Sequence, residues 1–259
     1  MKKSYIILGL VFVLLVWVAS IFYKETSPVV SDTSNLTQTP EIVDCTRTTR
    51  QKNEPQYDRA LSLIAQKYSL WEDSGEGEDS WYFFPSRLVN CIRIIEDDTR
   101  GSSGVEGYFV FNSPEIKSDY FPITVNSDYS STDDLTTALL LVHEITHVQQ
   151  YLESLNGSDE LSCIDKETEA FYAQWKFFGI MNSEEWKSIE YRIENDSVLH
   201  PQLTILESIR SSLNLDGVRN ECLYGSGKNN KNCIDNYRKN EIRKMIEQDE
   251  FYQRQCSIQ

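Results

Sequence analysis

The chain is 259 residues long but contains only three histidines, and its 25 basic residues are outnumbered by 40 acidic ones. The net charge of −15 argues against a nucleic-acid partner, because clustered Lys and Arg side chains are needed to bind a phosphate backbone. None of the six cysteines forms a Cys-x-x-Cys pair, so a cysteine zinc site is not expected. Since 40% of the residues are hydrophobic, a folded acidic protein is predicted.

The longest hydrophobic run lies at the N-terminus, where residues 5–22 carry no charge and follow Lys2 and Lys3. A helix of about 18 residues rises about 27 Å, close to the hydrocarbon thickness of a membrane. We therefore predict a signal anchor over residues 1–24, and the positive-inside rule places the rest of the chain outside the cytoplasm as a single-pass membrane protein. Cleavage near Val18-Ala19-Ser20 would instead give a secreted protein.

Residues 25–44 are rich in Ser, Thr and Pro and predict a flexible stalk, which leaves residues 45–259 for one domain. An even number of cysteines outside the cytoplasm indicates up to three disulfides among Cys45, Cys91, Cys163, Cys222, Cys233 and Cys256. Cys222 and Cys233 flank a short polar loop and are the best local pair. Cys45 could pair with Cys256 and join the two ends of the domain.

The hydrophobic pattern of this domain changes from helix to sheet and back to helix. Residues 56–70 have helical spacing. Short runs of aromatic and β-branched residues then predict a small antiparallel sheet, with strands at residues 81–84, 88–95, 107–111 and 121–125. Further helices are predicted at residues 135–155 and at about 165–180, 183–194, 202–213 and 234–253. The expected fold is α+β with a helical C-terminal half.

The helix at residues 135–155 is expected to cross the core. A capping box over Ser131-Thr132-Asp133-Asp134 precedes it, and Asn156-Gly157 supplies its end. Residues 139–142 are apolar on every side of the helix. The sheet is therefore expected to pack on this helix.

The same helix carries His143-Glu144-Ile145-Thr146-His147, the H-E-x-x-H pattern. Residues four positions apart share a helix face, so the two imidazoles can bind one zinc ion. Glu144 is rotated by about 100° from His143, which places its carboxylate beside a metal-bound water. The alternative is a helix with two incidental histidines, but these two interrupt an apolar helix as a pair. We predict a single catalytic Zn²⁺ bound by His143 and His147, with Glu144 as general base.

A catalytic zinc site needs a third protein ligand, and Glu153 stands where the metzincin pattern has its third histidine. At Glu167-Thr168-Glu169-Ala170 the chain resembles the gluzincin metallopeptidases, whose H-E-x-x-H is followed by Glu-x-x-Ala-(Asp/Asn) on a later helix. Phe171 replaces the acidic or amide residue, so the group that steadies a ligating histidine is not identified. The resemblance covers roughly residues 131–180, and HEITHVQQ also resembles the HE(L/I)THxxQ pattern of small bacterial peptidases.

Glu167 and Glu169 compete for the role of third ligand. Glu167 shares a face with residues that are mostly apolar or small: Ala170, Phe171, Gln174 and Phe178. The face of Glu169 would place Lys176 toward the core, so both the motif and the face favour Glu167. Asp165 and Asp159 are weaker candidates. If both glutamates were surface carboxylates, the zinc would lack a ligand.

The resemblance implies a zinc peptidase acting on a peptide or protein substrate, and the predicted anchor at residues 1–24 makes it membrane-bound and extracytoplasmic. His200, Tyr172 and Tyr191 are candidates for stabilising the oxyanion. In related folds the edge strand beside the zinc helix holds the substrate, and residues 121–125 are expected to be that strand or a plain core strand. The alternatives are an inactive metallopeptidase-fold interaction module at the cell surface and a zinc hydrolase of another bond. The oligomeric state is not predicted.

Overall fold

The computed structural model describes residues 48–73, 84–97, 106–111, 120–127, 133–158, 160–195 and 231–257, together with Cys45, Ile116, Tyr129 and Cys222. All of them belong to one unit of the chain, Pro40–Gln259. The predicted anchor at residues 1–24, the stalk at 25–44 and the helix at 202–213 lie outside the described residues. No described helix is long and apolar enough to cross a membrane.

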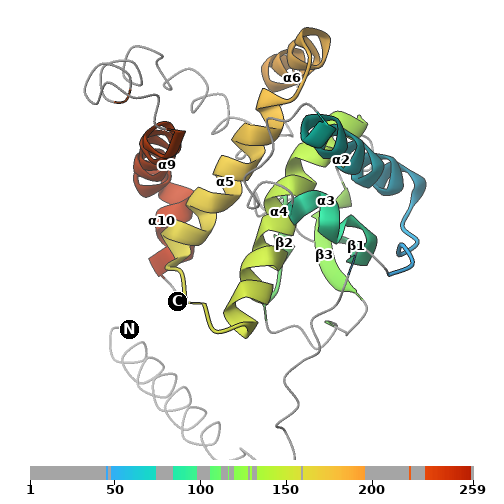
Figure 1. Ribbon diagram of the computed structural model, residues 1–259, viewed down its shortest axis with the longest axis horizontal. Coiled ribbons are helices and arrows are strands. Elements are labelled where there is room, and N and C mark those ends of the chain that lie inside the picture. The colour runs from blue at the N-terminus through green and yellow to red at the C-terminus, as the bar shows by residue number, and fades with distance from the viewer. Residues whose placement is uncertain are drawn as a thin grey trace, which may run out of the picture. The chain divides into compact units, whose positions relative to one another are not determined.

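The fold is α+β, with a small sheet and mostly helical content. Figure 1 shows α4 (Asp134–Leu155) between two groups of elements. On one side are α2 (Pro55–Asp73), α3 (Phe84–Leu88) and the sheet, and on the other is α5 (Cys163–Gly179). The remaining helices, α6 (Ser183–Asn195), α9 (Lys231–Gln248) and α10 (Glu250–Ser257), follow α5 in the chain. Both α9 and α10 pack on α5.

Helix α4 crosses the core as predicted, because every residue from Leu135 to Gln150 is buried. It ends at Asn156, and Gly157 follows with a positive φ of 80°, as expected for a helix stop. The predicted capping box is wrong, however. The cap is Asp133, whose side chain accepts a hydrogen bond of 2.7 Å from the backbone N–H of Thr136.

The sheet has three strands, in the order β1 (Ile92–Asp97), β3 (Phe121–Asn126), β2 (Gly107–Phe109). The central strand β3 runs parallel to β1 and antiparallel to β2, so the sheet is mixed and the prediction of an antiparallel sheet is wrong. Of the two alternatives for residues 121–125, the plain core strand is confirmed and the edge strand is wrong, because β3 lies between β1 and β2. Strand β2 ends at Phe109 opposite Ile123, so Pro122 lies just beyond the two-sided part of β3, where a missing N–H costs less.

The strands predicted at residues 81–84 and 88–95 are replaced in part by helix. Helix α3 begins at Phe84, and Pro85 fits the first turn of a helix because no hydrogen-bond donor is needed there. A short 3₁₀ helix, η2 (Val89–Cys91), follows, so the strand begins only at Ile92. Residues 81–83 lie outside the described part of the chain.

The described cysteines form three disulfides: Cys45–Cys91, Cys163–Cys256 and Cys222–Cys233. The local pair Cys222–Cys233 is confirmed, and the pairing of Cys45 with Cys256 is wrong. The carbonyl of Cys45 accepts a hydrogen bond from the side chain of Asn90, which brings Cys45 beside Cys91. Three disulfides indicate that the protein matures in an oxidising, extracytoplasmic environment.

Candidate metal centre

The three predicted ligands come together between α4 and α5. One ligand atom each from His143, His147 and Glu167 lies within 4.8 Å of the other two. The Nε2 atoms of His143 and His147 are 3.2 and 3.8 Å from the two carboxylate oxygens of Glu167. Two ligands about 2.1 Å from one tetrahedral zinc ion lie about 3.4 Å apart, so this spacing fits a single ion.

Both histidines are held by glutamine side chains. Nδ1 of His143 lies 3.2 Å from Oε1 of Gln174, and Nδ1 of His147 lies 2.9 Å from Oε1 of Gln150. Each glutamine donates its amide N–H to a backbone carbonyl at 2.9 Å, that of Leu139 for Gln174 and that of Lys166 for Gln150.

These contacts determine the histidine tautomers. An amide nitrogen must face each backbone carbonyl, so the amide oxygen faces the imidazole, and an oxygen can only accept. Nδ1 of each ring therefore carries its proton, which leaves the Nε2 lone pairs of His143 and His147 for a metal ion. Two imidazole nitrogens and one carboxylate are a donor set that zinc commonly takes.

Comparison with protein-family models, with curated proteins and with solved structures finds no match for this chain.

The two glutamines supply the orienting groups that the motif at Phe171 left unidentified. The Phe171 ring packs at right angles to the imidazole of His143, with 4.8 Å between ring centroids. Gln174 shares the buried face of α5 with Glu167, and Gln150 lies one turn after His147 on α4. The sequence indicates Gln174 only through its position, because the helical period places this glutamine on the buried face of its helix.

The alternative carboxylates lie elsewhere. Glu169 pairs with Lys239 of α9 at 2.6 Å, and Asp165 pairs with Arg243. Both pairs are partly exposed, on the side of α5 that faces α9. Asp159 and His200 lie outside the described residues.

Burial and charge act against each other at the three ligands. Burial favours the uncharged form of Glu167, but the two histidines together hold its pKa below the usual range, so it is ionised. Burial also opposes protonation of His143, yet Glu167 and Glu144 raise its pKa. At His147 burial prevails and lowers the pKa, with help from the charge of Lys166. An ionised Glu167 between two imidazoles suits a divalent cation.

Glu144 is buried on the side of α4 that meets β2. A Cβ built at Gly107 would lie 3.4 Å from Cγ of Glu144 and 3.3 Å from a side-chain carbon of Leu140. Glycine at this position therefore lets the strand approach the helix closely. Among the described strands, β2 pairs only with β3. The edge of the sheet beside the metal centre is therefore β2, in place of the strand predicted from the sequence.

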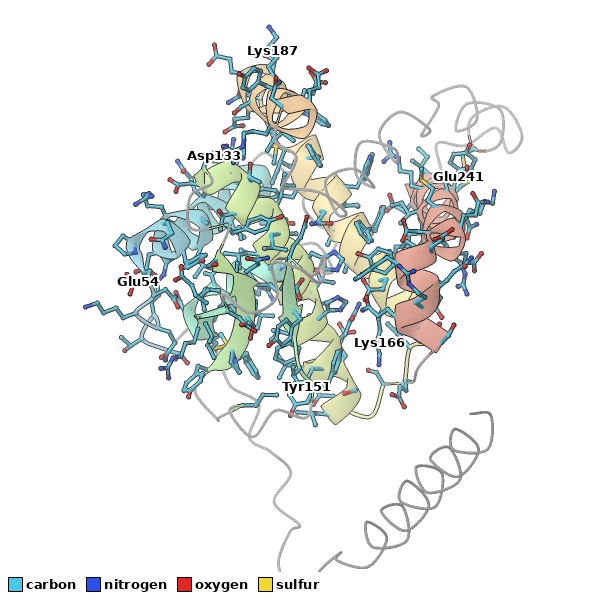
Figure 2. All side chains as sticks on the ribbon, turned by 180° about the vertical axis from the view of Figure 1, so that it is seen from behind. Glu54, Asp133, Tyr151, Lys166, Lys187 and Glu241 are labelled. Atoms are coloured by element: carbon cyan, nitrogen blue, oxygen red, sulfur yellow. A yellow bond between two sulfur atoms is a disulfide. The ribbon has the colours of Figure 1, made fainter. Side chains whose placement is uncertain are left out.

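Phe111, just after β2, connects the two helices at one side of the site. Its ring centroid lies 6.4 Å from that of His147 and 6.1 Å from that of Tyr151 on α4. The ammonium group of Lys166 on α5 lies 4.7 Å from the centre of the Phe111 ring. Figure 2 shows the labelled Tyr151 and Lys166 at the same end of the molecule, on α4 and α5.

Helix α10 brings two residues to the site that no sequence motif indicated. Tyr252 is buried, and its ring centroid lies 5.5 Å from that of Phe171. Burial, followed by the charges of Glu167, Glu106 and Glu144, raises its pKa well above the usual range, so its hydroxyl stays protonated. Gln255 donates a hydrogen bond of 3.3 Å to Glu167.

The tyrosines that the sequence suggested lie away from this group. Tyr172 stacks on Trp175 and contacts Lys239 of α9, and Tyr191 is 66% exposed. Glu106, directly before β2, was also missed. It is buried and accepts a hydrogen bond of 2.8 Å from the hydroxyl of Tyr129.

Proposed function

We propose that this protein is an extracytoplasmic zinc peptidase of gluzincin type, with His143, His147 and Glu167 as metal ligands and Glu144 as general base. The observation that carries the proposal is the joint orientation of the ligands. Gln174 and Gln150 direct the Nε2 atoms of both histidines toward Glu167, while Glu144 stays outside this set of three. A site that served only structure would not need Glu144, the glutamate of the motif.

Each residue of the site has a separate role in the proposed hydrolysis. A bound zinc ion would supply Lewis acidity, which makes a water more acidic and a peptide carbonyl more electrophilic. Glu144 accepts the proton of the attacking water and returns it to the amine leaving group. Tyr252, whose hydroxyl is neutral and near these carboxylates, is our candidate for donating a hydrogen bond to the oxyanion in place of Tyr172, Tyr191 or His200.

The substrate in this proposal is an extended peptide that lies along β2. The backbone of an edge strand offers N–H and C=O groups for pairing with an added strand. Gly107 places this strand against Glu144, so a peptide bond held there would be close to the general base. The three disulfides support an oxidising compartment, and membrane attachment through residues 1–24 remains a prediction.

The first test compares Glu144→Gln with the wild-type full-length chain after loading with zinc. Cleavage of a mixed peptide library should fall by at least about a hundredfold, because the proton acceptor is lost. Zinc content should stay at one ion per chain, since Glu144 is not a ligand. Stoichiometric zinc without any cleavage by the wild type would contradict the peptidase and favour the interaction module.

The second test uses two glutamates on the same helix. Glu167→Gln should lose most of its zinc, because an amide replaces the anionic ligand. Glu169→Gln is the matched control and should retain zinc, because Glu169 pairs with Lys239 at the surface of α5. Zinc loss from the Glu169 variant alone would contradict the assignment of the ligands.

A further inference from the structure

Helix α10 forms a wall of the metal centre. Gln255 donates to Oε1 of Glu167, the same oxygen that lies 3.8 Å from Nε2 of His147. Tyr252 packs edge-on against Phe171, and Phe171 packs edge-on against His143. Two side chains of α10 thus support ligands on both α4 and α5.

Helix α10 has two other attachments: its junction with α9, where Asp249 caps the helix, and Phe251, which packs against the core. It spans only eight residues, Glu250–Ser257, and a helix of that length is not stable by itself in water. Tyr252 is its only fully buried side chain, while Glu250, Gln253, Arg254, Gln255 and Ser257 are exposed. Its position against α5 must therefore come from a small number of contacts.

The covalent contact is the disulfide between Cys256 and Cys163. Cys163 begins α5 and lies four residues before Glu167, on the same face of that helix. Cys256 directly follows Gln255. The disulfide therefore joins α10 to α5 one helical turn from the metal ligand, next to the residue that donates to it.

This disulfide is the one in which both cysteines are partly exposed. Cys45 and Cys91 are 3% and 0% exposed, and in the third disulfide Cys233 is partly exposed but Cys222 is 0% exposed. Thiol–disulfide exchange requires access of the attacking thiolate to a sulfur atom. A dithiol reductant should therefore open Cys163–Cys256 before the buried Cys45–Cys91 bond.

We propose that the Cys163–Cys256 disulfide holds α10 as a removable wall of the metal centre, through which Gln255 positions Glu167. When a dithiol reductant reduces this bond, the two thiols of the reductant are oxidised to a disulfide. Cys163 and Cys256 receive the two electrons and two protons and become free thiols. Release of α10 then removes the hydrogen bond to Glu167 and lowers metal affinity. The inference rests on the metal site of the proposed function and does not require peptide cleavage.

Cobalt(II) binding to the full-length chain tests the role of Gln255. Loss of a group that orients a metal ligand typically costs 10- to 100-fold in affinity, and the contact here is long, so Gln255→Ala should weaken cobalt binding about tenfold. Gln253→Ala is the matched control on the same helix, because Gln253 donates to the carbonyl of Glu247 and does not contact the site. Its affinity should stay within about twofold of wild type.

Removal of the Cys163–Cys256 disulfide tests whether it holds α10 against the metal centre. Cys163→Ser with Cys256→Ser should weaken cobalt binding at least as much as Gln255→Ala. Adding Gln255→Ala to this double variant should cause little further loss, because two changes that act through one contact are not additive. The double variant Cys222→Ser/Cys233→Ser is the control. Cys233 lies near the start of α9, about 22 Å along that helix from its end before α10, so cobalt affinity should be unchanged.

Several outcomes would overturn the proposed role of the Cys163–Cys256 disulfide. Unchanged cobalt affinity in Gln255→Ala would do so, and this variant keeps all three disulfides, so the test holds even if the double serine variant fails to fold. Independent, multiplicative losses from Gln255 and the cysteine pair would also overturn it. Absence of cobalt binding by the wild type would overturn both proposals. Cobalt binding without peptide cleavage would overturn only the peptidase.

Discussion

Gln174 gives the most demanding test of how the metal centre is built. Its side chain is completely buried and joins His143 on one side to the carbonyl of Leu139 on the other. In Gln174→Leu a side chain of similar size fills the same space, so the change removes two hydrogen bonds without opening a large cavity. Both partners belong to α4 and stay buried, so water cannot replace the lost amide.

Two effects follow, and they can be measured separately. A buried polar group left without its partner costs about 1–3 kcal/mol. The carbonyl of Leu139 keeps its hydrogen bond within α4, so the loss falls on His143 and lowers the free energy of unfolding by about 1–3 kcal/mol in metal-free protein. The ring of His143 also loses the group that sets its tautomer. Zinc or cobalt affinity should therefore fall about 10- to 100-fold, which corresponds to about 1.4–2.7 kcal/mol.

Urea unfolding of metal-free protein gives the first quantity, and competition with a chelator gives the second. Gln149→Leu is the control, because Gln149 is a buried glutamine of α4 that bonds Glu153 in place of a histidine. It should leave metal affinity unchanged. If Gln174→Leu loses less than about 0.5 kcal/mol of stability and binds metal as wild type does, the bridge from α5 to His143 is not formed and our account of the tautomers is refuted.

Three further changes test the packing and charge around the site. Gly107→Val should lower stability by about 1–3 kcal/mol in thermal unfolding and reduce any peptide cleavage, because the valine side chain would crowd Leu140 and Glu144. Stability and cleavage equal to wild type would show that β2 is not held against α4. Ile145→Ala should cost about 2–5 kcal/mol in urea, since this fully buried side chain leaves a cavity, and a cost below about 1 kcal/mol would contradict its burial. Partial burial opposes ionisation of Glu185, but Lys67, 2.6 Å away, holds its pKa below the usual 4.5. The pair therefore contributes about 0.5–1 kcal/mol to the free energy of unfolding above about pH 4.5, and this contribution is lost as pH falls through the lowered pKa. The stability advantage of wild type over Glu185→Gln should vanish at about pH 3. A pH-independent difference in stability would exclude the ion pair.

The features predicted correctly are those that depend on the period of one helix. The ends of α2, α5 and α6 lie within three residues of the ranges expected from hydrophobic spacing. The placement of His143 and His147 on one face of α4, and of Glu167 instead of Glu169 on the buried face of α5, follows from the same rule that residues three or four apart share a face. A local rule needs no knowledge of which elements pack together.

The features predicted wrongly or missed depend on contacts between segments far apart in the chain. The direction of β1 relative to β3 and the partner of Cys45 are examples, because neither strand period nor cysteine count says which segments meet. Tyr252 and Gln255 belong to this group, since α10 follows Glu167 by more than 80 residues and no motif connects them.

The sequence by itself therefore determined the two helices of the candidate metal centre and the residues that each presents, because helical periodicity is a property of consecutive residues. Only the tertiary structure decided what surrounds those residues: the glutamines that orient both imidazoles, the glycine that brings β2 to Glu144, and the helix joined by a disulfide that supports Glu167. The physical reason is that buried polar groups are satisfied by whichever partner the packing brings near, and packing is decided by the whole chain.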